Sequence, residues 1–166
     1  MKCEYSEGTD HRISNKDKIH CMEKVKIGEV AAASVKDGDT MIVDSGTTAL
    51  DVAKNLNTDY NLSIITNAVN IVNYPLYFCN INIIVPGGVI HGNSYCWIGP
   101  IAKKNIANLY VDKVFIWVDG FGVTNGVFAP NIEEEALSQC MMEIAKEVSL
   151  VTDSSKFNRK SFTFIW

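Results

Sequence analysis

The chain has 166 residues, of which 47% are hydrophobic and 20% are charged, and its net charge is −4. These values are typical of a single globular domain and exclude a disordered or fibrous chain. A negative chain without clustered Lys and Arg is not expected to grip a nucleic-acid backbone, and no apolar run has the roughly 18 residues that a membrane span requires. Membrane contact is therefore not predicted.

The N-terminal residues 1–22 are polar and aperiodic, which predicts a tail or linker ahead of an ordered domain over 23–166. The opening "MKCEYSEGTDHRISNK" has no apolar core, so it is not a signal peptide and a cytoplasmic location is expected. Five widely spaced cysteines and three histidines provide no pairs at zinc-ligand spacing. Reduced thiols, no metal and no cofactor are predicted.

Helices and strands are predicted to alternate along the ordered part of the chain. The apolar spacing favours helices over 23–35, 47–57, 68–74, 99–109 and 132–147, and short apolar runs favour strands over 40–44, 62–66, 81–86, 113–119 and 149–153. Runs such as "SIIT", "INIIV" and "KVFIWV" do not alternate with polar residues, which is typical of strands covered on both faces. The predicted fold class is therefore α/β, with a mainly parallel sheet flanked by helices.

Polar residues or glycines follow every predicted strand. They are Asp44 to Thr48, Thr66-Asn67, Gly87-Gly88, Asp119-Gly120 and Asp153 to Lys156. In an open α/β sheet, ligands bind beyond the carboxyl ends of the strands, so this coincidence predicts a ligand site at that edge. A helix cap at Thr66-Asn67 and a simple turn at Gly87-Gly88 remain alternatives.

The segment that follows the first strand, "DSGTTALDV", has the features of a phosphate site. Gly46 lets the backbone approach a ligand closely, and the free N–H groups at a helix start point toward an anion. The hydroxyls of Ser45, Thr47 and Thr48 add donors of similar reach. The alternative is that Ser45 or Thr47 only caps the helix.

Four further polar residues allow a functional or a structural interpretation. Asp119 leaves a buried strand, so it is expected to find sugar hydroxyls, backbone N–H groups or a cation as partners, unless it only forms a turn. Asn131 and Glu134 in "PNIEEEAL" have the spacing of a capping box and could also lie over the mouth of the site. Lys156 could neutralise a phosphate or simply be solvated.

Seven segments, in this order, resemble the C-terminal effector-sensing domain of DeoR-type bacterial transcriptional regulators. They are "DGDTMIVDSGTTALDVAKNL", "IITNAVNIVN", "IIVPGGVIH", "WIGPIAKKNI", "DKVFIWVDGF", "APNIEEEAL" and "VTDSSKFNRKSF". The resemblance covers about residues 23 to 164. It implies a fold similar to ribose-5-phosphate isomerase and the CoA transferases, a phosphorylated sugar or related metabolite as effector, and control of DNA binding by an attached winged helix-turn-helix domain.

The resemblance also implies a role for each polar residue at the strand ends. The phosphate would be held by Ser45, Gly46, Thr47, Thr48 and Lys156. The sugar hydroxyls would be faced by Asp44, Asp119, Asn131 and Glu134. The site would be shaped by Thr66, Asn67, Gly87, Gly88 and Gly120. No catalytic residue and no metal ligand is implied.

Both ends of the chain depart from the family pattern. Residues 1–22 are too short and too polar for three DNA-binding helices, so operator DNA is expected only through a domain missing from this chain. The stretch "SFTFIW" stops without a flanking turn, which predicts a truncated C-terminus. A homo-oligomer is expected, because helix-turn-helix repressors commonly read repeated half-sites as symmetric dimers.

Two other functions remain open. A sugar-phosphate isomerase on the same fold would need a carboxylate base, for which Asp119 and Glu134 are candidates. A pure oligomerisation module is weaker, because it leaves the polar strand ends unexplained. The sensor is favoured over the isomerase because "IEEEAL" lies at a helix start, where the dipole keeps carboxylates ionised and lowers their basicity.

Overall fold

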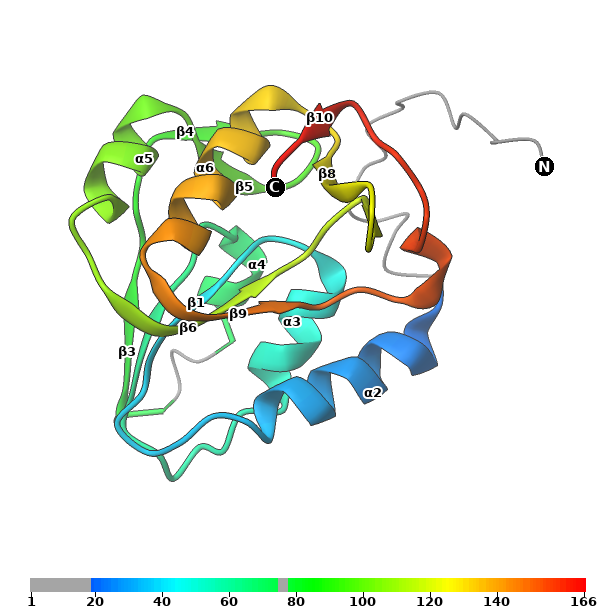
Figure 1. Ribbon diagram of the computed structural model, residues 1–166. Coiled ribbons are helices and arrows are strands. Elements are labelled where there is room, and N and C mark those ends of the chain that lie inside the picture. Colours follow the sequence, from blue (N-terminus) through cyan, green and yellow to red (C-terminus); the bar gives the residue numbers. More distant parts are fainter. Residues whose placement is uncertain (1–18, 75–77) are drawn as a thin grey trace.

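A five-stranded parallel sheet forms the centre of the computed structural model, which describes residues 19–74 and 78–166 (Figure 1). The strands lie in the order β3-β2-β1-β6-β9, and each neighbouring pair is parallel. Their bounds are β1 (Thr40–Val43), β2 (Leu62–Ile65), β3 (Ile81–Ile84), β6 (Val111–Ile116) and β9 (Ala145–Leu150). The predicted α/β class with a mainly parallel sheet is confirmed.

Helices cover both faces of this sheet. Their bounds are α2 (Cys21–Ala32), α3 (Thr47–Lys54), α4 (Val69–Val72), α5 (Pro100–Ile106) and α6 (Ile132–Glu143). Residues of α2, α3 and α4 form one buried cluster with Met41 and Val43, whereas residues of α5 and α6 form another with Ile42. Successive side chains of a strand point to opposite faces, so β1 contributes to both clusters.

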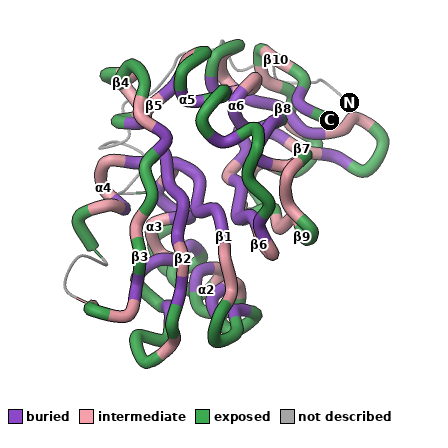
Figure 2. Tube along the Cα trace, turned by 90° about the vertical axis from the view of Figure 1, so that its left-hand side faces the viewer, coloured by how far each residue is buried: buried purple, intermediate pink, exposed green. Residues whose placement is uncertain are grey.

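Burial follows the position of each strand in the sheet. The central residues Met41, Ile42 and Val43 have no exposed surface, which accounts for the uninterrupted apolar run of β1. The edge strand β3 buries Ile81 but leaves 44% of Ile84 exposed. Figure 2 shows this gradient, with purple tube in β1 and β2 and green and pink tube along β3.

Two smaller sheets follow the main strands in the chain. β4 (Val89–His91) and β5 (Cys96–Ile98) form an antiparallel hairpin after β3. β7 (Gly120–Gly122), β8 (Gly126–Ala129) and β10 (Thr163–Phe164) form an antiparallel sheet in the order β10-β8-β7. The apolar pattern of the sequence does not predict these five strands, because strands of two to four residues are too short to show a periodicity.

One pair of predicted boundaries is wrong. α6 ends at Glu143 and β9 begins at Ala145, so the helix predicted over 132–147 is too long and the strand predicted over 149–153 begins too late. None of the six residues of β9 is fully buried, so this edge strand lacks the apolar run that marks a covered strand. β6 is also shifted, because the strand predicted over 113–119 begins at Val111 and ends at Ile116.

The other predicted elements are present, with ends that differ by at most three residues. Of the tail predicted over 1–22, residues 1–18 lie outside the described residues, and α2 already begins at Cys21.

The order of the strands determines where a ligand can bind. From β1 the chain proceeds outward to β2 and β3, and then returns to place β6 and β9 on the other side of β1. The order therefore reverses between β1 and β6. In open α/β sheets this switch point, at the carboxyl ends of the two strands, is the usual place of a ligand site.

Candidate functional site

Gly46 joins β1 to α3 in a conformation that favours glycine. It is the N-cap of α3, with φ of 128°, and an added Cβ would lie 2.7 Å from Trp117 Cγ. Trp117 follows β6, so this contact joins the two strand ends at the switch point. No side chain caps α3, so the alternative that Ser45 or Thr47 caps this helix is wrong.

Hydroxyl groups surround the start of α3. Ser45 Oγ accepts a hydrogen bond of 3.3 Å from Trp117 Nε1. Thr47 and Thr48 are buried, yet their hydroxyls form no hydrogen bond with another part of the described chain. The first N–H groups of a helix also lack acceptors within the helix. The segment therefore retains donors that an anion such as phosphate can accept from.

Asp44 is a buried carboxylate with one oxygen unpaired. Only 2% of the residue is exposed, and its Oδ1 accepts a hydrogen bond of 2.7 Å from the Ser45 backbone N–H. Its Oδ2 is buried and has no hydrogen-bond partner. Burial, with a smaller effect of the Glu134 charge, raises the pKa of Asp44 to about 7 against the opposing hydrogen bond from Ser45. Asp44 therefore changes between its protonated and charged forms near neutral pH.

Glu134 lies in the first turn of α6 and is 5% exposed. Its backbone N–H donates to Asn131 Oδ1 at 2.8 Å, so the predicted cap by Asn131 is confirmed. Its side chain does not bond back to Asn131, as a full capping box requires, but accepts a hydrogen bond of 2.6 Å from Ser94 Oγ. Glu134 Oε2 and Asn131 Nδ2 are buried and have no partner.

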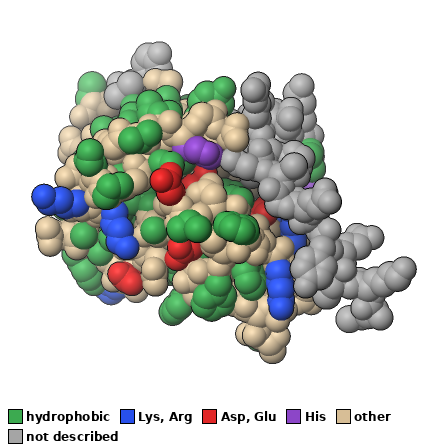
Figure 3. All heavy atoms as spheres, turned by 90° about the horizontal axis from the view of Figure 1, so that it is seen from above, with side chains coloured by type: hydrophobic (Ala, Val, Ile, Leu, Met, Phe, Trp, Pro, Cys, Tyr) green, Lys and Arg blue, Asp and Glu red, His purple; other side chains and the backbone are tan. Residues whose placement is uncertain are grey.

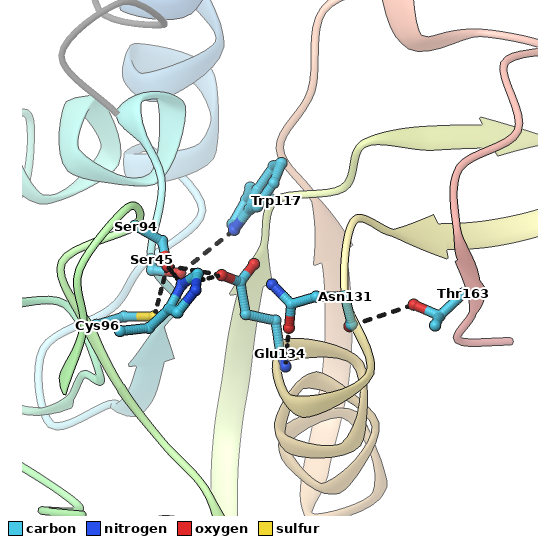
Figure 4. Close-up of polar contacts among 8 residues, drawn as sticks. Ser45, Ser94, Cys96, Trp117, Asn131, Glu134 and Thr163 are labelled. Carbon is cyan, nitrogen blue, oxygen red and sulfur yellow. Dashed lines mark hydrogen bonds and ion pairs between the residues drawn. The ribbon is translucent and has the colours of Figure 1, made fainter. Parts of the chain in front are cut away.

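The β4–β5 hairpin contributes residues that the sequence analysis misses. Ser94 Oγ lies 2.7 Å from His91 Nδ1 and 3.2 Å from Cys96 Sγ, while His91 Nδ1 lies 3.4 Å from Glu134 Oε1. Figure 4 shows Ser94 and Cys96 on one side of Glu134, with Ser45 and Trp117 beside them. The segment "HGNSYC" predicts a turn, but only the folded hairpin brings its polar residues to α6.

Cys96 is surrounded by the two carboxylates but is not a reactive thiol. Burial, followed by the charges of Glu134 and Asp44, raises the pKa of Cys96 to about 12. The thiol therefore stays protonated at neutral pH, and nucleophilic chemistry at this residue is not supported.

Thr66 and Asn67 lie at the end of β2 and are buried. Thr66 Oγ1 accepts a hydrogen bond of 3.1 Å from the Ala68 backbone N–H, which closes a local turn, while the N-cap of α4 is Ala68 itself. The Asn67 backbone oxygen accepts a bond of 2.7 Å from Trp97 N–H of β5. Asn67 Oδ1 is buried without a partner, and the Asn67 side chain helps to lower the pKa of Asp44.

Asp119 and Lys156 belong to a second cluster. Lys156 Nζ donates to Asp119 Oδ1 at 2.9 Å, Ser161 Oγ donates to Oδ2 at 2.8 Å, and Arg159 Nη2 lies 3.6 Å from Oδ2. Burial alone would raise the pKa of Asp119, but the bonds from Lys156 and Ser161 and the nearby cations outweigh it and lower the pKa. The predicted pairing of a carboxylate with donors holds for Asp119, and the donors come from the protein.

Of the three remaining glycines assigned to the site, two allow close contacts within the protein. An added Cβ at Gly88 would lie 2.6 Å from the Ile98 carbonyl oxygen, and one at Gly120 would overlap the Arg159 carbonyl. At Gly87, by contrast, the added atom would meet open space. The roles of all predicted site residues toward a ligand stay predictions.

Seen from above, the molecule presents a histidine side chain and acidic side chains close together among hydrophobic ones (Figure 3). Within residues 19–74 and 78–166, no group of three His, Cys, Asp or Glu side chains is arranged to hold a metal ion. In the same ranges no helix is long and apolar enough to cross a membrane.

Comparison with protein families places the chain among sensor domains. The model of the DeoR C terminal sensor domain matches residues 19–165. A putative aga operon transcriptional repressor of Escherichia coli O157:H7 is 30% identical over 149 residues, which are 90% of this chain and 55% of the relative. The HTH-type transcriptional repressor GlcR of Bacillus subtilis is 31% identical over 140 residues, which are 84% of this chain and 54% of the relative. The chain thus spans little more than half of these relatives.

Solved structures share the fold at low sequence identity. Ribose 5-phosphate isomerase A from Methanocaldococcus jannaschii matches with a TM-score of 0.60 and 16% identity, over 82% of this chain and 54% of that chain. The translation initiation factor eIF-2B from Pyrococcus horikoshii OT3 matches with a TM-score of 0.55 and 14% identity, over 90% of this chain and 53% of that chain. The expected similarity to the ribose-5-phosphate isomerase fold is confirmed.

Proposed function

The chain belongs to the DeoR C-terminal sensor domains, and from this premise we propose that it binds a phosphorylated sugar at the carboxyl edge of its parallel sheet. One observation carries the proposal: the chain leaves β1 through Asp44, whose buried Oδ2 is unpaired, and enters α3 at Thr47 and Thr48, whose buried hydroxyls are unbonded within the described chain, and this junction lies at the switch point of the sheet. Glu134, whose charge acts on Asp44, adds a second buried and unpaired acceptor. Donors suit a phosphate, and acceptors suit a group that carries donors, such as a sugar hydroxyl.

In this proposal the two sets of groups have separate roles. Ser45, Gly46, Thr47 and Thr48 hold the phosphate through hydroxyl and backbone N–H groups. Asp44, Asn131 and Glu134 hold the sugar, and Asn67 lines the same side. Lys156 and Asp119, which pair with each other at 2.9 Å, join the site only if effector binding rearranges that pair.

We further propose that the effector controls DNA binding by an attached domain. The relatives that this chain matches are named HTH-type regulators or repressors, and the chain spans about half of their length. A ligand shifts a conformational equilibrium only if it binds the two states with different affinity. Side chains from the sheet edge, the β4–β5 hairpin and α6 meet near one point, so an effector there can change how these elements pack. A homo-oligomer is part of this proposal.

A sugar-phosphate isomerase is the second candidate, because one observation favours it. Asp44 is buried and has a pKa raised to about 7, which suits a general base at neutral pH. Asp119 is a poor base, since its pKa is lowered by its partners. The structural likeness to isomerases concerns the fold and does not favour their chemistry.

NMR in deuterated water tests the sensor against the isomerase. We expect ribose 5-phosphate or hexose 6-phosphate signals to broaden with the protein, without deuterium exchange at the carbon next to the carbonyl. Exchange that needs the protein and disappears in Asp44→Asn would establish an isomerase instead. Absence of broadening and exchange with every sugar phosphate would reject both functions.

A further inference from the structure

Three buried acceptor atoms of the site lack hydrogen-bond partners. They are Asp44 Oδ2, Asn67 Oδ1 and Glu134 Oε2, on residues that are at most 5% exposed. Buried polar atoms are nearly always paired, because an unpaired one loses its bonds to water without replacement. Asn131 Nδ2, a buried donor on the residue that caps Glu134, is unpaired as well, so three unmatched acceptors stand against one unmatched donor. This excess of acceptors indicates a ligand that brings several donors.

The three acceptors belong to one neighbourhood. The charge of Glu134 acts on Asp44, and the Asn67 side chain also interacts with Asp44. Ser94 connects the group, because its hydroxyl contacts both Glu134 Oε1 and Cys96 Sγ. Figure 4 shows Ser45, the residue next to Asp44 in the chain, on the same side of Glu134 as Ser94 and Cys96.

The charge of this neighbourhood is not balanced by Lys or Arg. Within the described residues neither Asp44 nor Glu134 forms an ion pair with either residue type, and the basic side chain in contact with Glu134 is that of His91, at 3.4 Å. Lys156 and Arg159 are held at Asp119. A phosphate at Ser45–Thr48 would place further negative charge next to Asp44. A sugar phosphate that carries only hydroxyls would bring no positive charge to offset this repulsion, so Asp44 would have to stay protonated, as its raised pKa already favours.

We propose that the effector is an amino-sugar phosphate, whose ammonium group binds the acceptors of Asp44, Asn67 and Glu134 while its phosphate binds the Ser45–Thr48 segment. This inference rests on the proposed function and specifies its ligand class. An ammonium has three N–H donors for three acceptors, and its positive charge compensates the carboxylates. A metal ion fits less well, since the described chain has no group of three ligating side chains.

Calorimetric titration with matched ligands tests the proposal. The probes are glucosamine 6-phosphate against glucose 6-phosphate and galactosamine 6-phosphate against galactose 6-phosphate. The N-acetylated forms of the two amino-sugar 6-phosphates, whose nitrogen carries no charge, serve as analogues. In the series that binds, we expect the ammonium compound to bind about tenfold more tightly or better than the hydroxyl compound, as charge-assisted hydrogen bonds predict. The N-acetyl compound should lose this advantage.

Two variants locate the effect. Glu134→Gln removes one charge at nearly constant shape and should reduce the preference for the ammonium compound. Glu133→Gln changes an exposed glutamate of the same helical turn and should keep it. Asp44→Asn provides a second variant if Glu134→Gln does not fold.

The outcomes separate the two levels of the proposal. Equal affinity for the ammonium and hydroxyl members of a pair, or a preference unchanged in both Glu134→Gln and Asp44→Asn, overturns the amino-sugar inference and leaves the phosphorylated-sugar proposal intact. Failure of every phosphorylated sugar to bind overturns the proposed function and this inference together. Binding of free glucosamine as tight as that of its phosphate overturns the phosphate assignment alone.

Discussion

At the scale of single residues, Asp44 combines two demands that conflict without a ligand. Its place directly after β1 puts the carboxylate at the edge where ligands bind, but there it is buried with one oxygen unpaired. Burial raises its pKa to about 7, so the folded protein holds this proton more tightly than the unfolded chain does. The charged form of Asp44 therefore destabilises the fold, as expected of a residue that serves a site and not the core.

This gives Asp44 a defined contribution to the pH dependence of stability. Because the pKa of Asp44 is raised on folding, its effect is most favourable below the ordinary pKa of an aspartate and is lost as the pH rises to about 7. Asp44→Asn should remove this loss, so the variant should gain free energy of unfolding relative to wild type between pH 4 and pH 8. The gain should reach a few kcal/mol, since one unit of pKa corresponds to about 1.4 kcal/mol.

Urea unfolding at several pH values measures this difference. Asp59→Asn, at an exposed aspartate, is the matched control and should follow the wild-type curve. A constant difference in free energy of unfolding between Asp44→Asn and wild type across this range would show that folding does not raise the pKa of Asp44.

The sequence predicts some of these residues and not others for a physical reason. Asp44, Ser45 and Asn67 follow apolar runs directly, and the sheet topology brings such strand ends together. Ser94, His91 and Cys96 reach the site through a hairpin whose two strands have three residues each, and no local pattern predicts their contact with α6. Ser94 bonds to a residue 40 positions away. The partner of Lys156 is likewise set by tertiary contacts.

At the scale of elements, the packing of α2 on α3 is unusually close. An added Cβ at Gly28 would lie 2.6 Å from the backbone of Asp51, so the two helices have no room for a methyl group between them at this point. α3 carries the Ser45–Thr48 segment at its start, and its position therefore depends on this contact. The site thus relies on a helix that precedes the sheet in the chain.

Gly28→Ala should destabilise the protein despite the better helix propensity of alanine. Overpacking typically costs about 1–3 kcal/mol, which is at least as large as the roughly 1 kcal/mol that alanine gains over glycine in a helix. Thermal unfolding of Gly28→Ala beside Gly92→Ala, where an added Cβ meets open space, measures the effect. Equal midpoints for the two variants would show that α2 and α3 are not packed so closely.

The apolar pattern predicts elements well where they are covered and poorly where they are not. β1 and β2 have strong runs because helices cover both of their faces, and their predicted ends differ by one residue from the structure. β9 has no fully buried residue, so the apolar pattern predicts helix where β9 starts at Ala145. The short antiparallel strands are defined by pairing with distant segments, as Thr163 with Ala129, and leave no periodic signal.

At the scale of the whole molecule, the fold brings separate parts of the chain to one edge. The parallel sheet supplies Asp44 and Asn67, the hairpin supplies Ser94, and α6 supplies Glu134. Ribose 5-phosphate isomerase A shares this architecture with a TM-score of 0.60, so the same scaffold carries an enzyme elsewhere. In this chain the unbonded hydroxyls at the start of α3 and the unpaired acceptors of Asp44, Asn67 and Glu134 support binding as the primary activity.

The central claim is that this edge binds the phosphate of a phosphorylated sugar. Calorimetric titration of wild type and Thr48→Val with a hexose 6-phosphate series and the matching free sugars tests it most directly, because the substitution removes one hydroxyl at nearly constant shape. We predict that wild type binds a phosphorylated sugar at least about tenfold more tightly than the free sugar, and that Thr48→Val loses most of this difference. Equal affinity for the two forms in wild type, or an equal loss for both in Thr48→Val, would contradict the claim.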